Sequence, residues 1–126
     1  MNKTIHSALF ITLLIFFIVS CRNKGIPFNK TGWNEVVDAK PCSPLRELMI
    51  DDLLTNHRIK GLTYKQLVSK LGNPDNIEFT GSNLLRYEIK EDNGVGDIVH
   101  IEALDFYFAK DSIITSWRIV KYDVDM

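Results

Sequence analysis

The residues best suited to chemistry in this 126-residue chain are Cys42, His57 and His100. A thiol activated by an imidazole is a nucleophile, so Cys42 paired with either histidine is one catalytic hypothesis. Neither histidine has a second ligand at the spacing of a metal site. The sequence also lacks the signatures of hydrolase nucleophiles, metalloprotease helices and phosphate-binding loops. We therefore expect no enzyme active site, no cofactor and no metal.

Two acidic stretches offer further alternatives. Asp51 and Asp52 are adjacent in a predicted helix, where neighbouring residues diverge by about 100° and do not share a face. We expect a salt bridge between this helix and a loop. Residues 92–97, bounded by Asp92 and Asp97, carry the acids and glycines of a calcium-binding loop. They lack its ligand spacing and its final glutamate, so we interpret them as a polar hairpin turn.

The N-terminus carries a segment without charged residues. Residues 8–19 would span about 18 Å as a helix, at 1.5 Å per residue, against about 30 Å for the hydrocarbon core of a bilayer. Their length fits the apolar part of a signal peptide better than a membrane-spanning helix. The segment ends in Ile18-Val19-Ser20-Cys21, which resembles the lipobox of bacterial lipoproteins.

The lipobox resemblance implies that residues 1–20 are a signal peptide and that Cys21 receives a diacylglyceryl group. One acyl chain binds a membrane only marginally, whereas the several chains of a mature lipoprotein anchor it stably. We therefore expect the membrane to be a partner through Cys21. The alternatives are an ordinary cysteine after a secretory signal and a short membrane anchor.

The remaining 106 residues are enough for one small domain. The whole chain has a net charge of −1, and removal of Lys3, the only charged residue in 1–20, leaves −2. A nucleic-acid-binding protein needs a concentrated basic face, so we expect no nucleic-acid partner. Lipidation of Cys21 would leave Cys42 without an intrachain disulfide partner. A buried free thiol is then the main interpretation, and an intermolecular one the alternative.

Residues 21–43 contain several glycines and prolines and little periodicity, which is typical of a tether between a lipid and a domain. Phe28, Trp33, Val36 and Val37 are too apolar for a wholly free linker. We expect the later part of this segment to dock on the domain, which spans residues 44–126.

Two helices are predicted at the start of that domain. The first has Ser43 as N-cap and Pro44 at its first position, and runs to about Asn56. Its spacing predicts an inner stripe of Leu45, Leu48, Met49, Asp52 and Leu53.

The second helix spans residues 64–71 and has the clearest local pattern. Thr63 and Gln66 form a capping box, in which each side chain satisfies a backbone N–H at the other residue. Gly72 ends the helix in a left-handed conformation, and Pro74 prevents its resumption.

Strands are predicted from Ile77 to Phe79, 85–89, 98–108 and 112–122, with a hairpin at Asn93-Gly94. In the third, alternation places Leu104, Phe106 and Phe108 on one face and Ile101, Ala103, Asp105 and Tyr107 on the other. One face would pack on the helices, and the other would be partly exposed or covered by residues 28–37. The fold class is therefore α+β, with two N-terminal helices on one face of a three- to four-stranded antiparallel meander.

An ordered set of motifs extends across residues 28–122. It comprises Phe28 with Trp33, Arg46-x-x-Met49-x-x-Asp52-Leu53, Gly61-Leu62-Thr63-Tyr64-x-Gln66-Leu67-Val68-x-x-Leu71-Gly72-x-Pro74, Tyr87, and Leu104-x-Phe106-x-Phe108. This set resembles the BamE/SmpA–OmlA group of small outer-membrane lipoproteins and similar lipoproteins of Bacteroidetes-like bacteria. Its arrangement of helices and strands is also similar to the repeat unit of β-lactamase-inhibitor-type proteins.

The resemblance implies a non-enzymatic envelope protein that is anchored in the outer membrane, faces the periplasm and contacts other proteins, as BamE does in assembling β-barrel proteins. Arg22-Asn23-Lys24, without an acidic cluster, favours the periplasmic face. We expect an envelope-protein partner and no small-molecule substrate. An inhibitor- or immunity-type binder is the alternative, and either kind of binder needs exposed contact residues. The candidates for partner contacts are Tyr87, Trp117, Asp92 and Asp97.

A substitution at the end of the second predicted helix tests its placement. Gly72→Val should lower the thermal midpoint more than His57→Ala, because a β-branched residue resists positive φ at a cost of about 1–2 kcal/mol. Thermal unfolding followed by circular dichroism measures both midpoints, and equal values would show that the helix does not end at Gly72.

Overall fold

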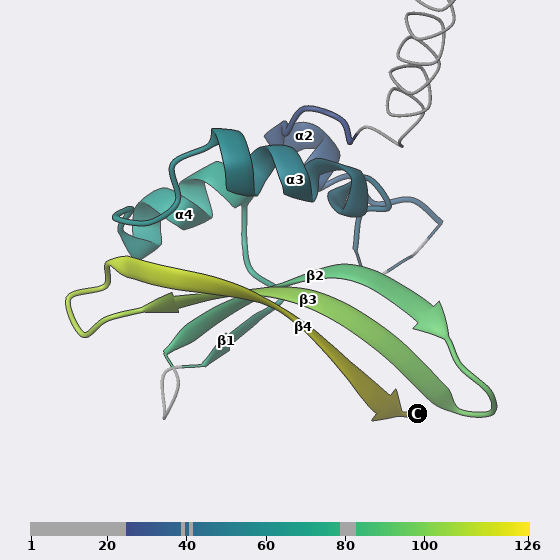
Figure 1. Cartoon of the computed structure of the whole chain (residues 1–126). Coiled ribbons are helices and arrows are strands. Elements are labelled where there is room, and N and C mark those ends of the chain that lie inside the picture. Colours follow the sequence, from purple (N-terminus) through teal and green to yellow (C-terminus); the bar gives the residue numbers. More distant parts are fainter. Residues whose placement is uncertain (1–24, 39, 41, 79–82) are drawn as a thin grey trace, which may run out of the picture.

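The computed structural model describes residues 25–38, 40, 42–78 and 83–126. The predicted signal peptide and Cys21 lie outside these residues. The described chain is α+β, with a helical layer on one side of a four-stranded antiparallel sheet (Figure 1). Its elements are α2 (Lys30–Trp33), α3 (Arg46–Asn56), α4 (Tyr64–Leu71), β1 (Asn76–Glu78), β2 (Leu84–Asn93), β3 (Ile98–Phe108) and β4 (Ile114–Asp125).

The helices of the described residues are all too short or too polar to cross a bilayer.

The sheet is a meander with strand order β1-β2-β3-β4, as the sequence predicts. Tyr87 on β2 is opposite Leu104 on β3, and Phe106 on β3 is opposite Trp117 on β4, so these side chains share the face under the helices. β2 contains a bulge, because the residue between Glu88 and Lys90 has no partner on β3. This extra residue, Ile89, is buried in the core.

The hairpin predicted from Asn93-Gly94 is confirmed, and its connection extends beyond these two residues. Asn93 is still part of the ladder, opposite Val99, and residues 94–97 form the connection. Gly94 N donates to Ile98 O at 2.7 Å, and Gly96 has φ +76°, a value that favours glycine.

Helix α3 starts later than predicted, and its predicted inner stripe is confirmed only in part, at Met49 and Leu53. It begins at Arg46, and the Ser43 hydroxyl accepts from Leu45 N at 3.2 Å while donating to Gly32 O at 2.6 Å. Its buried positions are Arg46, Met49 and Leu53, whereas Leu48, predicted to be inside, is 44% exposed. The inner stripe is displaced by one residue because a charged side chain, Arg46, occupies a core position.

Helix α4 confirms the predicted capping box. Thr63 Oγ1 accepts from Gln66 N at 3.1 Å, and Gln66 Oε1 accepts from Thr63 N at 2.9 Å. Gly72 has φ +88° and ψ −173°, so the helix ends there as predicted. This conformation is extended at positive φ rather than left-handed helical, and it is almost restricted to glycine.

The segment before α3 docks on the helix side of the sheet. Trp33 is fully buried, with its ring 6.2 Å from that of Tyr87 and 5.8 Å from that of Phe28. Asn34 Nδ2 donates to Leu71 O at 2.8 Å and so satisfies a free carbonyl at the end of α4. The prediction that this segment docks is confirmed for Phe28 and Trp33, but Val36 is 74% exposed. The alternative that it covers the opposite face is wrong.

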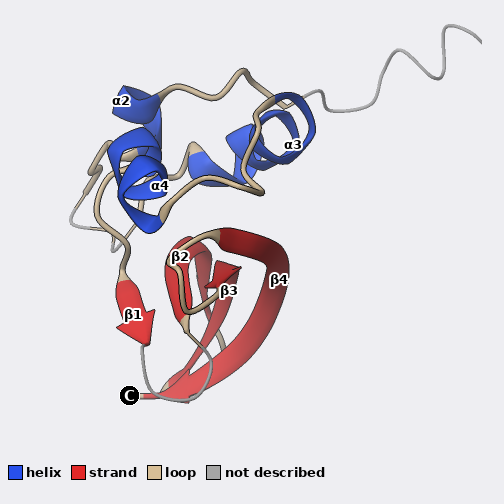
Figure 2. Ribbon diagram, turned by 90° about the vertical axis from the view of Figure 1, so that its left-hand side faces the viewer, coloured by secondary structure: helices blue, strands red, loops and turns tan. Residues whose placement is uncertain are grey.

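The opposite face of the sheet is concave and has its own buried ion pair. Figures 1 and 2 show the strands coiling away from the helical layer. Arg86 on β2 donates two hydrogen bonds to Asp105 on β3, at 2.7 and 2.8 Å, and its guanidinium lies 4.9 Å from the ring centre of Tyr122 on β4. Asp105 is almost completely buried, so these long side chains cover this face without any helix.

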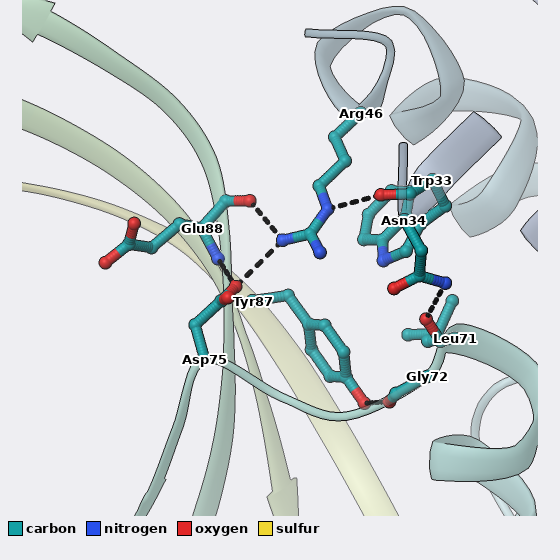
Figure 3. Close-up of polar contacts among 8 residues, drawn as sticks. All are labelled: Trp33, Asn34, Arg46, Leu71, Gly72, Asp75, Tyr87 and Glu88. Atoms are coloured by element: carbon teal, nitrogen blue, oxygen red, sulfur yellow. Dashed lines mark hydrogen bonds and ion pairs between the residues drawn. The ribbon is translucent and has the colours of Figure 1, made fainter. Parts of the chain in front are cut away.

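Arg46 joins the helical layer to the sheet (Figure 3). Its Nε donates to Trp33 O at 2.8 Å, and its Nη1 donates to both Asp75 Oδ2 and Glu88 O at 2.8 Å. The guanidinium also lies 5.1 Å from the ring centre of Trp33. One buried side chain therefore connects α2, α3, β2 and the loop before β1.

Substitution of Arg46 tests this connection. Arg46→Met should lower the free energy of unfolding by about 3 kcal/mol, because it leaves a carboxylate and two buried carbonyls without their donor. Urea denaturation measures the change. The control Lys65→Met removes an exposed cation from α4 and should shift the value by less than about 0.5 kcal/mol. Similar losses in the two variants would contradict a structural role for Arg46.

Candidate partner-binding surface

Tyr87 is a core residue, so its prediction as a partner contact is wrong. Its side chain is completely buried, and its hydroxyl donates to Gly72 O at 2.8 Å. Burial also raises the pKa of the phenol. The alternation of the strand predicted which residues share a face with Tyr87, but it did not show which face of the sheet the helices would cover.

The other three predicted contacts lie at the surface in two separate places. Trp117 is 38% exposed on β4 and is opposite Phe106. Asp92 is opposite His100, six residues from Phe106 along β3, which corresponds to about 20 Å at 3.3 Å per residue. Asp97 lies in the β2–β3 connection, and its carbonyl accepts from Met126 N at 2.8 Å. The structure therefore places Asp92 and Asp97 at the same end of the sheet, away from Trp117.

The sheet extends beyond the helical layer at the end that carries Asp92 (Figure 1). We call residues 90–102 and 119–125 the projecting sheet end. On the side that the helices cover elsewhere, each of its three strands contributes a basic and an acidic side chain with one residue between them. These side chains line a hollow of about 410 Å³ and are Lys90 and Asp92, His100 and Glu102, and Lys121 and Asp123.

The two lysines of this hollow are paired loosely, whereas His100 Nδ1 is in close contact with Asp123. Lys90 Nζ lies 3.4 Å from Glu47 and 3.5 Å from Asp92, and these carboxylates raise the pKa of its ammonium. Lys121 Nζ lies 3.8 Å from Glu102. Exposed pairs of this kind contribute little to stability, so their charges can be redirected to a partner at small cost.

A second hollow, of about 300 Å³, lies between the loop before α3 and the end of β2, and it shares Lys90 and Asp92 with the first. Cys42 lines it as a buried free thiol, as predicted. Burial raises the pKa of this thiol, which reduces the thiolate available for nucleophilic attack.

Neither histidine forms a catalytic pair of the kind considered from the sequence. Both ring nitrogens of His57 are engaged, Nε2 with Asp52 at 3.1 Å and Nδ1 with Lys70 at 3.0 Å. His100 Nδ1 contacts Asp123 on the neighbouring strand. Within the described parts of the chain, no three His, Cys, Asp or Glu side chains are placed to hold a metal ion.

Asp52 instead holds the N-terminal segment on α3. Its Oδ2 accepts from Phe28 N at 2.7 Å, and Lys70 lies 5.5 Å from the ring centre of Phe28. Hydrogen bonds from Asn56 and then from Phe28 N lower the pKa of the Asp52 carboxyl. The expected contact between this helix and a loop is therefore present, as the hydrogen bond that Asp52 accepts from Phe28 N, and Asp52 also lies 3.1 Å from His57 Nε2 just beyond the helix.

Of the charged residues that make the hollow, Asp92 was predicted from the sequence as a partner contact. The others were missed, because Lys90, His100 and Lys121 are separated along the chain and each resembles an ordinary solvated strand residue. The only local signal was the alternation of cation and acid at Lys90 and Asp92 and at Lys121 and Asp123.

Comparison with protein-family models, with curated proteins and with solved structures finds no match to this chain.

Proposed function

We propose that this protein is a lipid-anchored cell-envelope protein that acts as a non-enzymatic interaction module. Cys21 would hold it on the outer membrane, facing the periplasm, with a role in outer-membrane protein assembly or envelope integrity. We also propose that α3 and α4 on the meander correspond to the two-helix arrangement of BamE-like lipoproteins. The observation that carries the binding role is the projecting sheet end, whose charged hollow lies outside the helical layer.

The projecting sheet end suits a protein partner. Three strands extend past the helical layer, and the loop at their tip is open, with Val95 93% exposed. The hollow has equal numbers of cationic and acidic side chains when His100 is protonated, and its loose ion pairs cost little to rearrange. Charges in such an arrangement select a complementary surface and orient it more than they add affinity.

The position of the docked N-terminal segment also bears on an anchor at Cys21. Ile26 N donates to Leu48 O at 2.8 Å, so the chain joins α3 from this residue onward. Four residues separate Ile26 from Cys21, so their Cα atoms lie at most about 18 Å apart when the chain is extended. A lipid at Cys21 would therefore hold the domain close to the membrane, with its orientation limited by the contact at α3.

Acyl labelling tests the anchor. The wild-type chain, expressed in a Gram-negative host with labelled palmitate, should carry the label, and Cys21→Ser should lose it because the acceptor thiol is absent. Cys42→Ser is the matched control and should stay labelled. Label that persists in Cys21→Ser would rule out this residue as the lipidation site.

Affinity purification tests the binding role. The wild-type chain, solubilised from membranes in detergent, should recover an envelope protein in stoichiometric amount. Asp92→Lys should reduce this recovery about tenfold, since it reverses a charge shared by both hollows, as expected for a charged contact worth about 1.4 kcal/mol.

The control for this experiment is Lys65→Glu, which reverses an exposed charge on α4 and should recover the partner as the wild type does. Recovery of the bait alone would contradict the proposed function. Recovery of a soluble enzyme whose activity the bait suppresses would instead assign the chain to the inhibitor-type alternative.

A further inference from the structure

Strand β4 is a long edge of the sheet. At its start, Ile114 N donates to Leu62 O at 2.8 Å and Ile114 O accepts from Gly61 N at 2.9 Å, so the loop before α4 covers this point. From residue 115 to residue 125, no strand among the described residues pairs with the outer side of β4. The backbone donors and acceptors of that side are open to another strand.

This edge lacks two of the features that usually protect one, although it carries charged side chains such as Arg118 and Lys121. Beyond residue 115 it has no proline, and its pairing with β3 has no bulge. Trp117, Ile119 and Val124 each leave more than a third of their surface exposed. A long, regular and partly apolar edge of this kind is a template for strand addition.

The side chains around Tyr122 are complementary to themselves. Lys121 and Asp123 flank Tyr122 on the helix side of the sheet, and Val120 and Val124 flank it on the concave side. A two-fold axis beside Tyr122 would oppose each Lys121 to an Asp123 and each Val120 to a Val124. Opposite charges and apolar pairs are favourable when directly opposed across antiparallel strands.

We propose that β4 pairs in antiparallel fashion with β4 of a second copy of this chain, about a two-fold axis at Tyr122. In antiparallel strands, directly opposed residues point to the same face of the sheet. A two-fold axis between two copies of one strand must therefore lie between a residue and the same residue of the second copy. An axis at Lys121 opposes two lysines, and one at Asp123 opposes two aspartates. Of the axes placed at residues 118 to 123, the one at Tyr122 alone brings opposite charges together and brings no like charges together.

The fold leaves room for this pairing. Tyr122 lies in the projecting sheet end, so the helices of each copy would stay over the far parts of the joined sheet (Figure 1). Lys121 is 79% exposed at its side chain, and its contact with Glu102 is 3.8 Å long, so Lys121 can turn to Asp123 of a second copy with little loss. Asp123 contacts His100 through Oδ1, but its side chain is 63% exposed and its carboxylate can accept from a second cation. The joined sheet would place the two charged hollows on the same side.

A charge exchange tests the register. The full chain, purified in detergent, should be a dimer by light scattering coupled to size exclusion. Lys121→Asp should weaken the dimer at least about tenfold, since it opposes aspartates at two positions. The double variant Lys121→Asp, Asp123→Lys should restore it, because the exchanged charges still oppose each other.

Disulfide trapping tests the axis itself. In a Cys42→Ser background, Tyr122→Cys should form a disulfide-linked dimer on mild oxidation, since opposed residues in antiparallel strands have Cα atoms about 4.5–5.5 Å apart, within the range of a disulfide. Val120→Cys is the matched control on the same face. Its own copies would be about four residues apart along the joined strands and should not cross-link.

A wild-type chain that is monomeric at every concentration would overturn the proposal, as would a double variant that stays as weak as the single one. Equal cross-linking of Val120→Cys and Tyr122→Cys would also overturn it. None of these outcomes changes the test of the binding role at Asp92.

Discussion

The buried guanidinium of Arg46 determines how the helical layer lies on the sheet. It is one of the least exposed charged groups among the described residues, and its donors go to backbone carbonyls at Trp33 and Glu88 as well as to Asp75. A buried cation must keep these partners, because its desolvation is costly without them. α3 is therefore fixed in rotation, and Trp33 is fixed between Arg46 and Tyr87. The docked segment before α3 is thus part of the fold rather than an addition to it.

The two faces of the sheet are covered by different kinds of side chain. The helix side is closed by aromatic and aliphatic side chains, while the concave side depends on Arg86, whose paired hydrogen bonds satisfy Asp105 and whose guanidinium covers Tyr122. Because the helices end before the strands do, a third environment exists at the projecting sheet end, where polar side chains replace the core pattern. We propose the binding function at the projecting sheet end because this part of the sheet contributes least to the core that the helices and strands share.

Features that depend on neighbours in sequence could be predicted, and those that depend on distant partners could not. The capping box of Thr63 and Gln66, the end of α4 at Gly72 and the extent of β3 all follow from local chemistry. The rotation of α3 could not be read from periodicity, since a buried arginine looks like a surface residue until its partners are known. The burial of Tyr87 and the assembly of the charged hollow likewise need the strand register and the placement of the helices.

The bulge at Ile89 lets one strand contribute to the core and then to the hollow. Ile89 is buried in the core, and because it has no partner on β3, Lys90 and Asp92 are opposite Glu102 and His100 on the helix side of the sheet. If Ile89 were instead paired with Glu102, the register would move by one residue, Lys90 and Asp92 would turn to the concave side, and Glu91 would be opposite His100. An apolar side chain would then take the place of a lysine in the hollow. The unpaired residue in β2 therefore determines whether this strand supplies a cation to the surface that we propose for binding.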